Sequence, residues 1–108
     1  MPTYLFKASY TKDGIAGVIR EGGSGRAKAV QDLVESAGGT VASMYWAFGD
    51  DDFLLIADLP DNTAAGALST TVAATGIASV STTPLLSPED IDAIVRKTQS
   101  ISYRPPGA

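Results

Sequence analysis

The 108-residue sequence contains no cysteine and no histidine. These residues are the commonest ligands of zinc, haem iron and iron–sulfur clusters, so their absence excludes most such centres. It also excludes thiolate nucleophiles and serine–histidine catalysis, because no imidazole is present to serve as the general base. A metal site would have to consist of oxygen ligands alone, and we expect neither a metal nor any other cofactor.

Basic residues are also few. Eight lysines and arginines stand against 12 aspartates and glutamates, which gives a formal net charge of -4. This balance disfavours nucleic acid and anionic membranes as partners. The sequence shows no basic region ahead of an apolar run near Met1, and no stretch approaches the roughly 20 apolar residues of a membrane span. We therefore expect a cytoplasmic location, which the lack of disulfides also fits.

The composition is that of an ordinary globular domain, with 44% hydrophobic and 19% charged residues. A chain of this length supports one hydrophobic core and hardly two. We predict a single domain over residues 1–98. Residues 99–108 lose the hydrophobic periodicity and include two consecutive prolines, so we expect a loose C-terminal tail.

Alternating apolar and polar residues predict four strands. In the first, Tyr4 and Phe6 lie on one face and Lys7 on the other. The third strand contains few polar residues and is expected at the centre of its sheet. A short connection joins it to the second strand, which predicts an antiparallel hairpin. The predicted strands cover residues 3–10, 40–48, 52–59 and 77–86.

Helical spacing predicts the remaining elements. One or two helical turns follow Gly14, the glycine-rich segment 22–25 interrupts them, and Ser24 is expected to cap the next helix. Asp61 is expected to cap another helix. Ser87, followed by proline and two acids, predicts the start of a last one.

This order predicts an α+β fold of the ferredoxin-like kind, βαββαβ with an added C-terminal helix. Its four-stranded antiparallel sheet should carry the two crossover helices on one face, because both crossovers return to the same sheet. The other face is then open and partly apolar. An exposed apolar face usually marks an interface, so we expect a homo-oligomer, a dimer or a multiple of it.

Tyr45 and Trp46 are neighbours on a predicted strand and must point to opposite faces. If Met44, Trp46 and Phe48 pack beneath the helices, the open face is a mixed polar and apolar floor. Such a floor suits either a small organic ligand or an ordinary dimer interface, and the two can coexist. The candidate ligand-binding residues on it are Lys7, Ser9, Ser43, Tyr45, Ser79 and Ser81.

Three features have a functional and a plain structural interpretation. Lys7 is the candidate for amine chemistry, but we favour its pairing with an acid such as Asp58. The segment Asp50–Asp52 could hold a hard cation, but we favour a solvated turn whose side chains bond their own backbone. The segment Gly22–Arg26 could bind phosphate, but its spacing fits no phosphate-binding motif, so we interpret it as a flexible connection.

Five short motifs are spread over residues 2–97. They are Pro2-Thr3-Tyr4, Asp13-Gly14-Ile15, Gly38-Gly39-Thr40-Val41, Tyr45-Trp46 and the region Gly49–Phe53. With these motifs the sequence resembles the GYD-domain family, small proteins similar in architecture to the dimeric α+β barrels. The namesake motif of that family is Gly, a variable residue, then Tyr-Asp. Gly49 and Asp52 stand in register with it, whereas Asp51 occupies the place of the tyrosine. The resemblance implies a paired sheet and an oligomer, and it implies no general activity.

These observations leave three hypotheses for function. The first is an oligomeric accessory or small-molecule-binding protein that uses the open sheet face. The second is a cofactor-independent enzyme similar to the monooxygenases and isomerases built on paired sheets, with Lys7, Tyr45 or Tyr10 as the acid–base group. The third is a purely structural assembly subunit.

Overall fold

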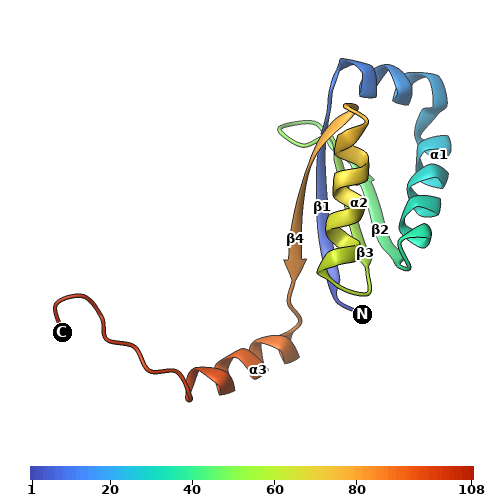
Figure 1. Cartoon of the computed structure of the whole chain (residues 1–108). Coiled ribbons are helices and arrows are strands. Elements are labelled where there is room, and N and C mark those ends of the chain that lie inside the picture. The colour runs from blue at the N-terminus through green and yellow to red at the C-terminus, as the bar shows by residue number, and fades with distance from the viewer.

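The sheet of this protein has its first strand near the centre, as a computed structural model of residues 1–108 shows (Figure 1). The strand order is β2-β3-β1-β4, and every neighbouring pair is antiparallel. The elements in chain order are β1 (Thr3–Tyr10), α1 (Lys12–Ser36), β2 (Thr40–Trp46), β3 (Phe53–Asp58), α2 (Asn62–Ala74), β4 (Ala78–Leu85) and α3 (Pro88–Thr98). This confirms the ferredoxin-like α+β architecture with an added C-terminal helix.

Strand β1 shows why the sheet has two different faces. Tyr4, Phe6 and Ala8 are buried, whereas the alternate residues Leu5 and Lys7 are only half-buried. Successive side chains of a strand point to opposite faces, so the buried set lies beneath the helices. The core consists of Tyr4, Phe6, Ala8, Val30, Val34, Phe53, Leu55, Ala57, Leu59, Ala65, Leu68 and Ala78.

Helix α1 is a single element with a sharp bend. Gly22 has φ 73° and ψ 172°, which breaks the helix into two segments. The predicted interruption is therefore confirmed, but it is confined to one residue. Ser24 is helical rather than an N-cap, because the second segment begins directly after Gly22. The predicted flexible connection was wrong for the same reason: residues 23–25 are part of the helix.

Helix α2 begins where its sequence predicts. The Asp61 side chain accepts a hydrogen bond of 2.9 Å from the Ala64 N–H, which satisfies one unpaired donor of the first turn. The hydroxyl of the buried Tyr4 donates to Asn62 Oδ1 at 2.6 Å and fixes the start of the helix to β1. A hydrogen bond between Ser69 and Thr82 joins the helix to β4. Helix α2 therefore covers the β1–β4 side of the sheet.

Helix α3 extends away from the rest of the chain (Figure 1). It has no buried residue, and Ile91, Ile94 and Val95 are exposed. The radius of gyration is 17.4 Å, whereas a compact domain of about 100 residues has about 13 Å. The exposed residues 99–108 continue beyond α3 without helix or strand. None of the helices combines the length and apolar character that crossing a bilayer requires.

The second and third strands are shorter than predicted. Strand β2 ends at Trp46, and Phe48 lies in the following loop with its side chain fully exposed. Phe48 therefore does not pack beneath the helices. The loop runs through Gly49 and the three aspartates, and Asp52 leads directly into β3. The hairpin is antiparallel, as predicted.

Candidate functional site on the open sheet face

The open sheet face is the side that no helix covers, and strand pairing places Lys7 in its middle. Lys7 lies opposite Leu54 of β3 on one side and Ser81 of β4 on the other. Leu54 in turn lies opposite Tyr45 of β2. Directly opposed residues share a face, so one row of side chains crosses all four strands.

The neighbouring rows bring the other predicted residues to the same face. Ser9 lies opposite Ser79. Ser43 lies opposite Ile56, which in turn lies opposite Leu5. A bulge between Val41 and Ser43 shifts the register of β2 and leaves Ser43 on the open face. All six candidate residues therefore share one face, and whether they bind a ligand stays a prediction.

These side chains are accessible in the single chain. The Tyr45 side chain is 66% exposed, and the Lys7 side chain is 39% exposed. Ser79 and Ser81 on the edge strand are also exposed. The face therefore offers one ammonium, one phenol and several hydroxyl groups around the half-buried Leu54.

The three consecutive aspartates hold the β2–β3 loop against the end of β1. The Ser9 hydroxyl donates to the Asp50 carbonyl oxygen at 2.6 Å, and the Tyr10 N–H donates to the Asp52 carboxylate at 2.8 Å. The side chain of Asp52, the aspartate of the GYD motif, therefore bonds the neighbouring strand. For this residue the prediction that the aspartate side chains bond the backbone of their own turn was wrong. The described residues contain no cluster of three or more acidic, histidine or cysteine side chains able to hold a metal ion.

Lys7 pairs with a different acid from the one predicted. Its Nζ lies 3.9 Å from Asp51 Oδ2. Asp58 instead accepts a hydrogen bond of 2.5 Å from the Thr3 hydroxyl, at the other end of β1. The β2–β3 loop folds back towards the centre of β1, so it delivers Asp51 to Lys7, and sequence spacing does not reveal this approach.

The predicted orientations of Met44 and Trp46 are confirmed. Met44 lies opposite Leu55 and packs against the core. Trp46 lies opposite Phe53, with their ring centroids 4.9 Å apart. Trp46 is nevertheless 37% exposed, because it is the last residue of β2. It therefore packs on the helix side without being fully buried there.

A second feature, which the sequence analysis missed, lies beneath the helices. It is a cavity of about 240 Å³ between α1, α2 and the buried face of the sheet, called here the helix-side cavity. Arg26 is the charged residue in its wall. The residues around it are Phe6, Ala8, Tyr10, Arg26, Val30, Leu33, Phe53, Leu55, Leu68, Thr71, Val72, Thr75, Ile77, Ala78 and Val80. One signal in the sequence could have indicated this cavity. Arg26 lies four residues before Val30, so it is a charged residue on the apolar stripe of α1.

A third, wider depression of about 930 Å³ lies in the angle between α3 and the start of β1. Its wall includes Pro2, Tyr4, Asp90 and Ile94. It is open because α3 leads away from the sheet at this point.

Comparison with known proteins gives one finding that covers most of the fold. The family model described as GYD domain matches residues 4–95, from β1 into α3. No curated protein matches the chain. The match includes the four strands, both crossover helices and the aspartate loop beside Lys7. Because it spans far more than half of the sequence, the chain belongs to the GYD-domain family.

Proposed function

We propose that the protein forms a homo-oligomer, a dimer or a multiple of it, in which open sheet faces of two copies pair and hold a small organic molecule between them. The observation that carries this proposal is the distribution of side chains on the open face. Leu5, Leu54 and Ile56 form a half-buried aliphatic centre on the two inner strands. Hydroxyl groups of Ser43 and Ser81 lie on the two outer strands. An apolar centre with a polar rim is the usual anatomy of a protein interface.

Lys7 gives the paired faces a polar group for a ligand. In a single chain the Lys7 side chain is 39% exposed, and its one acidic neighbour is Asp51 at 3.9 Å. An ammonium group has three donors, so donors remain for the carbonyl or carboxylate oxygen of a bound molecule. Tyr45, in the same row, supplies a phenol on the other side of Leu54. The proposed ligand is therefore a small molecule with hydrogen-bond acceptors and an apolar body.

Helix α3 supports assembly independently of the sheet. Its exposed residues Ile91, Ile94 and Val95 recur at helical spacing and form one apolar stripe. Within the chain this stripe covers no core residue, since α3 has no buried position. In the proposed oligomer a second copy covers it.

Light scattering at micromolar concentration tests the assembly. We expect the mass of a dimer or a multiple of it, and we expect Ile56→Lys to give monomers because it places a charge in the aliphatic centre. Ile19→Lys is the matched control, since Ile19 is 79% exposed on α1 and away from the sheet. A monomeric natural protein, or equal dissociation by Ile19→Lys, would overturn the proposal.

Native mass spectrometry of freshly isolated protein tests the ligand. We expect a retained small molecule whose occupancy falls in Lys7→Met and Tyr45→Phe while the melting temperature stays within a few degrees. These variants keep most of the side-chain volume and remove polar contacts. Tyr103→Phe in the exposed C-terminal segment is the control for Tyr45→Phe. Unchanged occupancy in both open-face variants would refute the ligand assignment and leave the assembly proposal standing.

A further inference from the structure

The helix-side cavity lies on the opposite side of the sheet from the face proposed for assembly. Its floor comprises Phe6 and Phe53 of the inner strands, and Leu68 of α2 contributes to its wall. A volume of about 240 Å³ exceeds the roughly 150 Å³ of an enclosed apolar cavity that binds benzene, so there is room for a small organic molecule of about ten non-hydrogen atoms. The apolar lining selects a ligand with an apolar body.

Arg26 gives the cavity a charge of one sign. The Arg26 side chain is 23% exposed, and its Nη1 donates to Glu21 Oε2 at 3.2 Å. This single hydrogen bond leaves other guanidinium donors free, and guanidinium binds carboxylates through two parallel hydrogen bonds. Tyr10 and Thr71, which carry hydroxyl groups, also line the cavity.

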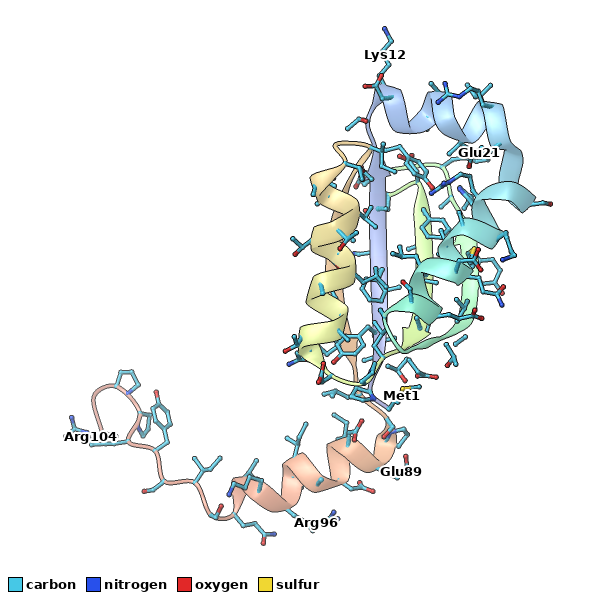
Figure 2. All side chains as sticks on the ribbon, turned by 45° about the vertical axis from the view of Figure 1, so that its right-hand side comes forward. Met1, Lys12, Glu21, Glu89, Arg96 and Arg104 are labelled. Atoms are coloured by element: carbon cyan, nitrogen blue, oxygen red, sulfur yellow. The ribbon has the colours of Figure 1, made fainter.

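The bend at Gly22 brings Arg26 to the wall of the cavity. Glu21 lies just before the bend and Arg26 just after it, so their ion pair connects the two segments of α1 (Figure 2 shows Glu21 at the bend). A straight helix would not bring the segment containing Arg26 back over the sheet.

Lys28 lies two residues after Arg26 but outside the cavity, where its Nζ donates to both carboxylate oxygens of Asp32. These hydrogen bonds and the carboxylate charge raise the pKa of Lys28 above its ordinary value.

We propose that the helix-side cavity binds a small amphiphilic carboxylate, with its apolar body over Phe6 and Phe53 and its carboxylate on Arg26. The assignment rests on charge complementarity: the cavity is apolar, and the one charge in its wall is positive although the whole protein carries -4. The ligand carboxylate takes the place of Glu21 beside the guanidinium or shares it. This site is separate from the open face, so the two proposals stand or fall independently.

Titration of the full-length protein with octanoate and with octan-1-ol, followed by amide chemical shifts in NMR spectra, tests the site. The two probes share an apolar chain, and octanoate alone carries the charge. We expect octanoate to shift the amides of Val30, Leu68 and Val72 and to bind about tenfold more tightly than octanol. Equal affinity for both probes would overturn the role of Arg26. Octanoate shifts confined to the open face around Lys7, or no saturable shifts, would overturn the site.

Three variants separate the charge of Arg26 from its structural role. Arg26→Gln should weaken octanoate binding about tenfold, whereas Lys28→Gln removes the same charge from outside the cavity and should leave binding unchanged. Glu21→Gln breaks the same ion pair but frees the guanidinium, so it should keep or increase the affinity. Equal weakening by Glu21→Gln and Arg26→Gln would show that only the bend matters, and would overturn the proposal.

A competing occupant of the cavity is the apolar stripe of α3 from another copy. The same spectra, recorded while a synthetic peptide of residues 87–103 is added to the octanoate-bound protein, address it. We expect no displacement of octanoate by the peptide. Saturable peptide binding at Val30 and Leu68 that excludes octanoate would assign the cavity to a helix and refute the small-molecule site.

Discussion

Gly14 shows how a single residue fixes the approach of two chain segments. Helix α1 begins beside the loop that precedes β4, where the Thr11 N–H donates to the Ile77 carbonyl oxygen at 2.8 Å. A Cβ atom at Gly14 would lie 2.1 Å from that same oxygen. Only glycine therefore allows the first turn of α1 to contact the end of the second crossover. This contact closes the core at the end of the sheet where Tyr10 lies.

Replacing glycine by alanine should have opposite effects at two positions. Gly14→Ala forces backbone apart, and we expect a loss of about 1–3 kcal/mol in the free energy of unfolding. Gly66, exposed in the middle of α2, has no atom within 4 Å of an added Cβ, so Gly66→Ala should gain about 0.5–1 kcal/mol through helix propensity. Urea unfolding of both variants measures the difference. Equal midpoints would contradict the close approach at Gly14.

At the scale of elements, α3 owes its helical form to its own sequence. The Ser87 side chain accepts from the Asp90 N–H at 3.1 Å, and the Asp90 carboxylate accepts from the Ser87 N–H at 2.9 Å. Acids occupy its first turn, whereas Arg96 and Lys97 occupy its last, which suits the helix dipole. A helix of 11 residues without buried contacts is nevertheless only marginally stable, because isolated helices of this length rarely persist in water.

Ser87→Ala should therefore melt α3 without affecting the core. The change removes the side-chain acceptor of the capping box, worth about 1 kcal/mol. We expect the helical Cα chemical shifts of Ile91 and Ile94 to decrease strongly under monomeric conditions, with shifts of β1 unchanged. Thr98→Ala at the other end of α3 is the control, since it leaves the capping box intact. A fully helical α3 in Ser87→Ala would mean that tertiary contacts hold it.

At the scale of the whole molecule, the sheet separates two environments of different character. The buried face carries aromatic and aliphatic side chains beneath α1 and α2, with Arg26 at the edge of the helix-side cavity. The open face carries the row from Tyr45 through Lys7 to Ser81. One strand, β1, contributes to both faces because its side chains alternate. Substitutions at neighbouring positions of β1 should therefore affect different properties.

Stability should be independent of bound metal. The aspartate loop is occupied by contacts to β1, through Asp52 to the Tyr10 N–H and through Asp51 to Lys7. We expect the same melting temperature, within about one degree, in the presence and absence of a chelator. A metal that binds only the folded state stabilises it, so removal of a structural metal lowers the melting temperature. A fall of several degrees on chelation would reveal an oxygen site that these contacts do not explain.

The elements with local causes could be predicted from the order of the amino acids alone. Alternation placed Tyr4 and Lys7 on opposite faces of β1, and residues within one turn placed the caps at Asp61 and Ser87. The element order then implied the ferredoxin-like topology and the shared face of the six candidate residues. These conclusions hold because strand and helix periods depend on the backbone, which is the same wherever the element finally lies.

The contacts between groups far apart in the sequence depend on the folded arrangement of the whole chain. It paired Lys7 with Asp51 and not Asp58, left Trp46 partly exposed, and directed α3 away from the sheet. It also created the helix-side cavity, whose wall comes from both helices and three strands. Such features depend on the bend at Gly22 and on the path of the β2–β3 loop. Periodicity shows which side of an element is apolar, but not what the other elements place against that side.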